Sequence, residues 1–349
     1  MKKSIFLLFI SISLSFISCK KTNSTLNSGG NKDKIANEEI TIGLSIDTIA
    51  IERWQRDLDV FVNKAKELNA NVIVQNAGND IEEQNRQLMY LYDCGVDVIL
   101  IISKKADGLV DTIQKIKSKN IPIISYDRLI LNSPIDLYIT INSKEVGEIM
   151  AKRMLQIAKG PIWYLILGPK EDYNMTFIQQ GIKKVIGNTN VKIDYIYYTN
   201  GWNYDLSYKE TVRLLTQKSI PDCFICGNDA VADSVRQAID EYSPNKNIPL
   251  CGQDGDIIAC QNIVNGLQDF TVYKPINELA EKAAEYAVLF AQNKDTSVIT
   301  SNFETINNGF ADIPVVWLHP QLVDKSNLDE LIIQNGFHTK KEIYLDNSK

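Results

Sequence analysis

The sequence predicts an α/β fold that consists of two mainly parallel β-sheets covered by helices. From Ile40 onward, short runs rich in β-branched residues alternate with longer segments of helical periodicity. The runs are apolar along almost their whole length, as strands buried on both faces of a parallel sheet are. Ten strands are at the upper limit for one open sheet, so the pattern favours two sheets of about five strands each.

The expected strands follow one another along the chain as "ITIGLSI", "NVIVQNA", "VDVILIIS", "IPIISYD", "LYITINS", "IWYLILG", "VKIDYIYY", "DCFICGND", "IPLCGQD" and "FTVYK". The segment after the first strand shows the helical period most clearly. Its apolar residues are spaced by 4, 3, 4 and 3, which places them on one face of a helix: Trp54, Leu58, Phe61, Ala65 and Leu68. A break between the two halves is expected near 140–143.

The region "TINNGFADIPVVWLHPQLV" is rich in Asn and Pro and does not have the pattern of another strand–helix unit. It is suited to returning the chain across both domains.

The composition, 44% hydrophobic and 23% charged over 349 residues, is that of a globular protein that is long enough for two domains. A net charge of −6 without an extended basic run argues against nucleic acid as a partner. The sequence has two His, His319 and His338, which argues against a His-rich metal site and against a His-based catalytic triad.

The N-terminus has the pattern of a secretory signal. Lys2 and Lys3 precede the apolar run "SIFLLFISISLSFIS", which is too short to span a bilayer comfortably. The Ser18–Cys19 junction is similar to a bacterial lipobox, although Phe16 departs from the usual small aliphatic residue. We expect a signal peptide over 1–18, lipidation of Cys19 and a flexible tether over 19–38. Ordinary secretion with a cut elsewhere is the alternative.

The "CFIC" pair, Cys223 and Cys226, has the spacing of zinc ligands or of a redox motif. It lies inside an expected strand, where residues three apart point to opposite faces. No second pair with this spacing follows, so small buried side chains are the favoured interpretation. The odd number of Cys after residue 19 also argues against a full disulfide framework.

Polar side chains gather where the expected strands end. In parallel α/β sheets, ligands bind beyond the carboxyl ends of the strands. Both halves of the chain place Asp, Asn, Arg, Lys or Trp at that edge, which makes one constellation: Asp47, Arg53, Trp54, Asp127, Arg128, Asp172, Asn174, Trp202, Asn228, Asp229, Asp254 and Lys274.

This constellation suits a sugar. Carboxylates accept hydrogen bonds from hydroxyl groups, Arg and Lys donate them, and Asn does both. A Trp indole offers a flat apolar surface to the C–H face of the ring, and two Trp could hold the ring between them.

Other roles remain open for several of these residues. Asp47, Asp172 and Asp229 follow strands, where an Asp often caps a helix. Asn228–Asp229 could be turn chemistry, Lys274 a solvated residue, and Trp54 part of the core. The stretch "GQDGD" lacks the further ligands of a calcium loop.

The motifs "ERWQRD", "SYDR", "GNDA", "GQD", "TVYKPI", "NNGFADIP" and "GFH" resemble the periplasmic binding proteins of type I fold, from about residue 39 to about 338. Within that group the chain is most similar to the D-xylose-binding proteins, the sugar-binding components of ABC importers. The resemblance implies two Rossmann-like lobes joined by a three-strand hinge, with the sugar between them and no cofactor. The lobes would comprise residues 39–142 plus about 274–304, and 143–273 plus about 305–345.

Carried over motif by motif, the resemblance implies sugar contacts from Arg53, Trp54, Asp127, Arg128, Asp172, Asn174, Trp202, Asn228, Asp254 and Lys274. The loop "PKEDYNMT" departs from the family pattern at Tyr173 and Thr176, which bears on Asp172 and Asn174. The resemblance further implies a monomer that hands its sugar to an ABC permease. On this interpretation, Arg53→Ala should remove most sugar affinity and leave the fold intact.

Three functions are consistent with these residues. The first is a lipid-anchored binding protein for D-xylose, or a related monosaccharide, that serves an ABC importer on the extracytoplasmic side of a membrane. The second is a sugar sensor that docks on a chemoreceptor or a histidine kinase. The third is an enzyme that uses Asp127 and Asp254 as a carboxylate pair; Arg and Lys neighbours, which keep these carboxylates ionised, and the lack of a phosphate loop argue against it.

Overall fold

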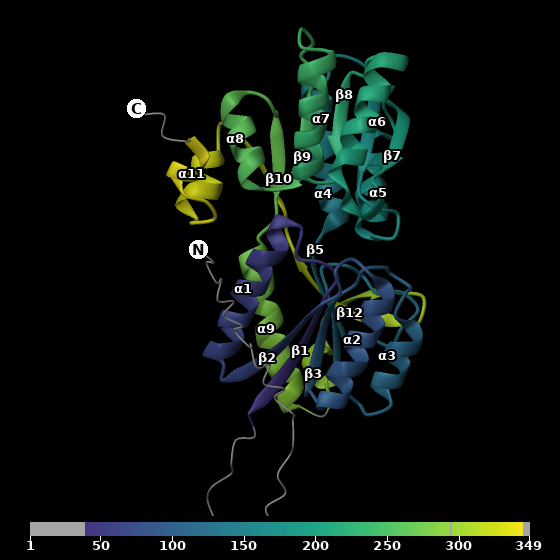
Figure 1. Ribbon diagram of the computed structural model, residues 1–349, viewed down its shortest axis with the longest axis vertical. Helices are drawn as coiled ribbons and strands as arrows, with labels where there is room; N and C mark the ends of the chain where they lie inside the picture. Colours follow the sequence, from purple (N-terminus) through teal and green to yellow (C-terminus); the bar gives the residue numbers. More distant parts are fainter. Residues whose placement is uncertain (1–38, 294, 345–349) are drawn as a thin grey trace, which may run out of the picture. The chain divides into compact units, whose positions relative to one another are not determined.

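A computed structural model describes residues 39–293 and 295–344 (Figure 1). The expected signal peptide, the lipidation site Cys19 and the tether over 19–38 lie outside these residues. The described chain contains two β-sheets with helices on their faces, so the predicted α/β fold is confirmed. Each sheet and its helices form one lobe.

Seven strands form the sheet of the first lobe in the part of the chain that the structure describes. All neighbouring pairs in it are parallel except β11–β12. Their spatial order is β11 (Glu304–Asn307), β12 (Asp312–Leu318), β5 (Leu137–Ile141), β4 (Ile123–Tyr126), β3 (Val98–Ile102), β1 (Ile40–Ile46) and β2 (Ala70–Asn76).

Helices cover both faces of this first sheet. The face with Ile42, Leu44 and Leu100 packs against α1 (Glu52–Glu67) and α9 (Ile276–Gln292). The opposite face packs against α2 (Ile81–Cys94) and α3 (Val110–Lys117). The expected apolar stripe of the first helix is largely buried, since Trp54, Phe61 and Ala65 belong to the core.

Six strands form the sheet of the second lobe within the described residues. Their spatial order is β13 (Gln321–Asp324), β10 (Phe270–Tyr273), β9 (Leu250–Asp254), β8 (Cys223–Cys226), β6 (Ile162–Leu167) and β7 (Lys192–Tyr198). Only the β10–β13 pair is antiparallel.

Helices also cover both faces of the second sheet. One core layer lies under α4 (Ser143–Ile157) and α5 (Asn174–Ile186), and the other lies under α6 (Tyr204–Gln217) and α7 (Asp229–Tyr242). Cys223 belongs to the first layer and Cys226 to the second, as the spacing on one strand predicted.

The remaining elements are short or lie near the end of the chain. They are η1 (Asn200–Trp202), α8 (Ile257–Asn265), α10 (Ser297–Thr300), a π-helical segment (Asp329–Gln334) and α11 (Lys340–Tyr344). Figure 1 shows α11 beside α8 in the second lobe. Over the described residues, no helix has the length and hydropathy needed to cross a membrane.

Three segments of the described chain connect the two sheets: β5 to α4 near 142, β10 to α9 near 274–275, and β12 to β13 near 319–320. The third crossing corrects the predicted lobe boundary. Residues from about 305 were assigned to the second lobe, but β11 and β12 belong to the first sheet. The reason is that β12 pairs in parallel with β5 and β11 folds back on β12, so the hairpin completes the edge of the first sheet before the chain returns.

Candidate ligand-binding site

A narrow cavity lies between the lobes. Its wall contains all ten residues that the sequence predicts to contact the ligand: Arg53, Trp54, Asp127, Arg128, Asp172, Asn174, Trp202, Asn228, Asp254 and Lys274. The structure therefore brings the predicted constellation together, while the role of each residue in binding stays a prediction.

The first lobe contributes two pairs of neighbouring residues. Arg53 and Trp54 lie in the first turn of α1, directly after the loop that follows β1. Asp127 and Arg128 follow the end of β4. The Trp54 indole is buried in the core and also lines the cavity, and the Arg53 guanidinium lies 4.2 Å from its ring centroid. Trp54 is thus part of the core, and its place in the cavity wall is compatible with the ligand contact that the sequence predicts.

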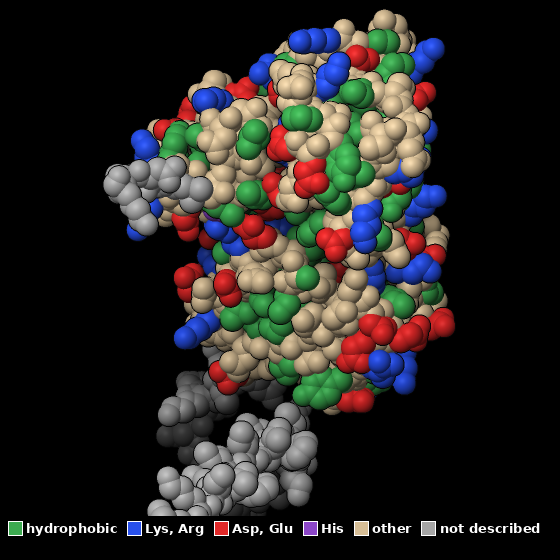
Figure 2. Space-filling view, turned by 45° about the horizontal axis from the view of Figure 1, so that its top comes forward, with side chains coloured by type: hydrophobic (Ala, Val, Ile, Leu, Met, Phe, Trp, Pro, Cys, Tyr) green, Lys and Arg blue, Asp and Glu red, His purple; other side chains and the backbone are tan. Residues whose placement is uncertain are grey.

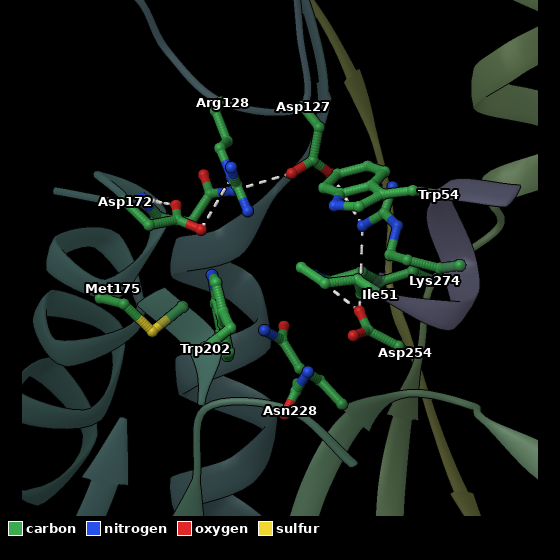
Figure 3. A pocket seen from close by; sticks show the side chains of 13 residues that line it. Ile51, Trp54, Asp127, Arg128, Asp172, Met175, Trp202, Asn228, Asp254 and Lys274 are labelled. Atoms are coloured by element: carbon green, nitrogen blue, oxygen red, sulfur yellow. Dashed lines mark hydrogen bonds and ion pairs between the residues drawn. The ribbon is translucent and has the colours of Figure 1, made fainter. Parts of the chain in front are cut away.

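The second lobe presents five predicted residues from the ends of four strands. Asp172 and Asn174 follow β6, Trp202 follows β7, Asn228 follows β8 and Asp254 ends β9. The carboxyl ends of all four strands point toward the first lobe, which is why these residues meet at one edge. Figure 3 shows Trp54 and Trp202 reaching the same space from opposite lobes.

Lys274 lies in the second crossing between the lobes, immediately after β10. Its side chain is only 3% exposed, so it is not a solvated surface residue. Its Nζ lies 3.0 Å from Oδ1 of Asp254. A cation in the connecting segment therefore contacts the wall of the cavity directly.

The structure shows which of the polar residues that follow strands cap a helix and which do not. Asn228 caps α7, because its Oδ1 accepts a hydrogen bond from the Val231 N–H (2.9 Å), while its Nδ2 lies 3.5 Å from the Tyr204 hydroxyl. Asp47 does not cap a helix; it pairs with Nη1 of Arg128 at 2.5 Å. Asp229 lies behind the cavity and accepts hydrogen bonds from the backbone N–H groups that follow Asp254.

Several of these side chains rest on strained backbone. Asp127 (φ 61°), Trp202 (φ 57°) and Asp254 (φ 109°) have positive φ. Residues other than Gly rarely adopt such values, and for a bulky residue such as Trp they are costly. Trp202 fits only because Gly168 lies beneath it: a Cβ at Gly168 would be 2.3 Å from the indole ring. Such strain is typical of ligand clamps.

Charged groups pair across the boundary between the lobes. Arg53 Nη1 lies 2.9 Å from Oδ2 of Asp127 in its own lobe and 3.8 Å from Oδ1 of Asp254 in the second. Arg128 Nε lies 2.9 Å from Oδ2 of Asp172. Asn174 Nδ2 donates to Oδ1 of Asp127 (2.9 Å). These contacts hold the two walls of the cavity against each other.

Buried charges behind the wall orient the arginines. Asp57 accepts hydrogen bonds from Nε (3.3 Å) and Nη2 (3.1 Å) of Arg53, and Tyr126 donates its hydroxyl to Asp57. Nη1 of Arg128 donates to Oδ2 of Asp47 (2.5 Å) and to the Ser103 carbonyl (3.1 Å). Each guanidinium is therefore fixed on one side and presents its remaining N–H groups to the cavity.

The pKa values of two cavity carboxylates differ in direction. Burial favours the neutral form of Asp127, but Arg53, Lys274 and Arg128 outweigh burial and hold its pKa below the usual value. Burial raises the pKa of Asp172, even though Arg128 lies beside it. The environment thus keeps Asp127 ionised, as an acceptor for hydroxyl groups.

The cavity wall is balanced in charge. Among the described residues that line it, three cations face three carboxylates: Arg53, Arg128 and Lys274 against Asp127, Asp172 and Asp254. Directly behind the wall, Asp47 and Asp57 add negative charge. A phosphate or a carboxylate would meet no excess of positive charge here, so the site favours an uncharged polar ligand.

Polar atoms in the wall remain available for such a ligand. Among the described residues that line the cavity, four buried atoms have neither a hydrogen-bond partner nor an ion-pair partner: Nε1 of Trp54, Nε1 of Trp202, Oδ1 of Asn174 and Oε1 of Gln253. Buried polar groups are nearly always hydrogen-bonded, so unpaired donors and acceptors around one cavity indicate a ligand that both accepts and donates. The residues described contain no group of His, Cys, Asp and Glu that could hold a metal ion.

Three cavity residues were missed from the sequence. Gln253 is a polar residue inside the buried strand β9, and that contrast could have revealed it. Its Nε2 donates to the Gly227 carbonyl (2.6 Å) and its Oε1 is unpaired. Ile51 and Met175 are apolar and carry no signal that separates them from core residues.

Comparisons with known proteins agree with this geometry. Residues 42–295 match the model of the periplasmic binding protein domain. The chain is 36% identical over 312 residues to a D-xylose-binding periplasmic protein of Haemophilus influenzae. The aligned region covers 88% of this chain and 93% of that protein. A protein of the same name from Escherichia coli is 33% identical over 311 residues, with the same coverage.

A solved structure shows the same fold. It is a solute-binding protein of an ABC transporter from Clostridium phytofermentans with bound β-D-glucose, at a TM-score of 0.79 and 24% identity, over 87% of this chain and 99% of that one. The match along most of the chain and the two-lobed architecture confirm the family resemblance that the sequence motifs indicated. The chain belongs to the periplasmic binding protein family.

Proposed function

We propose that this protein binds D-xylose, or a closely related monosaccharide, outside the cytoplasm and delivers it to the permease of an ABC transporter. The observation that carries the proposal is the wall of the cavity: balanced charge, four unpaired polar atoms and two indole groups around one space. Relatives at 36% and 33% identity that are named as D-xylose-binding support the choice of sugar.

The cavity residues take distinct parts in this proposal. Arg53, Arg128 and Lys274 donate to sugar oxygens, and Asp127 and Asp254 accept from hydroxyl groups. Asn174, Asn228 and Gln253 can each donate and accept. The indole rings of Trp54 and Trp202 cover the apolar C–H faces of the ring, while their Nε1–H groups remain free to reach hydroxyl groups at its edge.

Binding requires the lobes to separate. Arg53, Asp127 and Asp254 are 3–4% exposed, so a sugar cannot reach them through the closed wall. The three crossings are the connections about which the lobes can move, in the manner of hinge closure around a ligand. On closure, the pairs Arg53–Asp254 and Arg128–Asp172 form together with the contacts to the sugar.

The place of the protein in the cell is part of the proposal. The secretory pattern of residues 1–18 and the lipobox-like Ser18–Cys19 junction are consistent with a lipid anchor at Cys19. Figure 2 shows Lys and Arg side chains interspersed with Asp and Glu on the visible face, an arrangement unlike a nucleic-acid surface. Mass spectrometry of the N-terminal peptide from the native host should find a lipidated Cys19, and an unmodified Cys19 contradicts the anchor.

Calorimetry with a panel of pentoses and hexoses tests the function. We expect tight binding of D-xylose, with a negative heat-capacity change as the cavity closes. The matched control is Arg86→Ala, because Arg86 is an exposed residue of α2 that pairs with Glu83 of the same helix; this variant should bind as the wild type does. Failure to bind any monosaccharide overturns the proposal. The relatives reported above are binding proteins by name, in keeping with a non-enzymatic role.

A further inference from the structure

Outside the cavity, Phe337 and His338 connect the two lobes. Nη1 of Arg56, on α1 of the first lobe, donates to the Phe337 carbonyl (2.6 Å), and the Arg56 guanidinium lies 4.3 Å from the Phe337 ring centroid. The Phe337 ring also packs edge-on against Tyr273, at 4.9 Å between centroids. His338 Nε2 lies 2.9 Å from the carbonyl oxygen of Gly255 in the second lobe.

The His338 contact falls on the turn that positions Asp254. Asp254 has a positive φ (109°), which is costly for a residue other than Gly, so the turn needs external support, while Gly255 adopts its positive φ (83°) without such a cost. Its N–H groups, those of Gly255 and Asp256, donate to Oδ2 of Asp229 (2.9 and 3.1 Å). Its Gly255 carbonyl is held by His338. The same turn presents Asp254 to Lys274 and to the cavity.

The two neighbours of the His338 ring determine its protonation state. The Gly255 carbonyl can only accept, so Nε2 must carry the hydrogen. The Arg56 guanidinium can only donate, and its Nη2 lies 3.5 Å from Nδ1, so Nδ1 must accept. Only the neutral ring with hydrogen on Nε2 satisfies both contacts. A second proton would place N–H against N–H and add a positive charge beside Arg56.

The other charged groups around His338 come from three elements. From α1, Arg56 lowers the pKa of His338 and Glu52 raises it; from α11, Glu342 raises it. The loop after β9 contributes the Gly255 carbonyl, with Asp254 and Asp256 on either side. Burial is the largest influence, and the net result is a pKa below the usual value for His. The neutral ring is therefore the form present at neutral pH.

We propose that neutral His338 is a positioning residue of the sugar site, which ties the strained Asp254–Gly255 turn to Arg56 of the other lobe and makes sugar affinity fall on acidification. This inference rests on the proposed sugar binding. The pKa of His338 is lowered in the folded protein. The contribution of its neutral ring to sugar affinity is therefore complete above the ordinary pKa of His and is lost as pH falls through the lowered pKa.

The tautomer can be tested without any sugar. The sequence contains two His, so the ring signals of ¹⁵N-labelled protein can be assigned by comparing the wild type with His338→Gln. We expect His338 to be the Nε2–H tautomer and to titrate below the ordinary value for His. A His338 ring with hydrogen on Nδ1, or one that titrates at or above the ordinary value for His, overturns the proposal.

Affinity for D-xylose as a function of pH tests the coupling to the site. Wild-type affinity should fall about tenfold more than that of His338→Gln between about pH 8 and about pH 5, since Gln can still donate to Gly255 but does not titrate. The control His319→Gln should follow the wild type. Arg56→Ala should bind about tenfold more weakly at about pH 8 and lose most of the pH dependence.

The outcomes separate this inference from the proposed function. Parallel pH profiles for wild type and His338→Gln overturn the role of His338, even if the sugar binds tightly. If no monosaccharide binds at any pH, the proposed function fails and so does the coupling to a sugar, while the tautomer found by NMR stands independently. Circular dichroism at each pH ensures that folded protein is compared.

Discussion

The Trp202 indole and Gly168 form a pair in which one residue makes room for the other. Trp202 adopts a backbone conformation that is unfavourable for a large side chain, and its ring covers the position where a Gly168 side chain would be. The strain at Trp202 is maintained by its surroundings, as at other ligand clamps. Gly168 therefore determines the place of a cavity residue, although it offers no functional group.

Gly168→Ala should weaken D-xylose binding by at least about tenfold, because the new Cβ would lie 2.3 Å from the Trp202 ring and displace it from the cavity. The fold should change little, since the ring is partly exposed and can turn away. Calorimetry measures the loss of affinity, and quenching of Trp fluorescence on sugar addition should diminish with it. Unchanged affinity would show that the ring does not contact the sugar.

Arg53→Ala is expected to reduce both affinity and stability. The sequence alone suggested that the fold would remain intact, but the structure shows Arg53 paired with the buried carboxylates of Asp57 and Asp127. Removal of one partner from such a cluster costs about 3–5 kcal/mol of unfolding free energy. Affinity should fall at least about 100-fold, because several charge-assisted hydrogen bonds are lost.

Urea unfolding and calorimetry measure these two effects separately. Arg86→Ala, which removes an exposed pair within α2, should leave both quantities nearly unchanged. Arg53→Ala protein that is folded and binds with wild-type affinity would contradict the assigned role. Loss of stability without loss of affinity would limit Arg53 to a structural part.

At the scale of elements, helices α4 and α5 lie unusually close because each carries a Gly at the contact. A Cβ at Gly147 would lie 2.0 Å from the carbonyl oxygen of Ile178, and one at Gly181 would lie 2.0 Å from that of Lys144. Both neighbours are backbone atoms, which cannot turn aside. This contact sets the place of α5, whose first residue is Asn174 of the cavity.

Either Gly147→Ala or Gly181→Ala should lower the free energy of unfolding by at least about 3 kcal/mol, the upper part of the range for overpacking, because the helices must move apart. Gly187→Ala, just after the end of α5, is the control: its nearest atom would be 3.2 Å away, in the same helix. Urea unfolding measures the difference. A cost below about 1 kcal/mol for both contact variants would contradict the close packing described here.

Periodicity was sufficient to predict most elements but not the lobe boundary. The stripe from Trp54 to Ala65 predicted α1 correctly, and the apolar runs predicted the parallel strands. The β11–β12 hairpin was assigned to the wrong lobe because pairing between β12 and β5 depends on contacts over 170 residues of chain, which no local pattern records.

The same limit applies to the site. The ten predicted residues could be found because they are polar or aromatic and follow the ends of strands, where the topology of a parallel sheet collects them. Gln253 lies one residue before the end of β9, and the pleat of the strand sets the direction in which its side chain points. Ile51 and Met175 resemble core residues, so only the folded structure reveals that they face the cavity.

At the scale of the whole described chain, the proposed function requires relative movement of the lobes. The cavity residues of both lobes are buried, and ion pairs such as Arg128–Asp172 join the lobes directly. Breaking these pairs without a compensating ligand is costly, whereas a sugar that bridges the lobes adds contacts only in the closed state. Sugar should therefore shift the population toward that state, as differential affinity requires.

A covalent link across the lobes should stop sugar exchange. Asn79, in the loop after β2, and Gly201, in η1, belong to different lobes, and Nδ2 of Asn79 lies 3.4 Å from the Gly201 carbonyl oxygen. Asn79→Cys combined with Gly201→Cys, treated with a short bifunctional thiol reagent, should retain bound D-xylose through dialysis and exclude added sugar when linked empty. Each single variant is a control for labelling at other sites; Cys94 is the half-buried thiol among the described residues, and the other four are buried. If the linked protein exchanges radiolabelled sugar as fast as the unlinked protein, then the cavity has an entrance that does not depend on separation of the lobes, and hinge closure is not the route by which this protein captures its ligand.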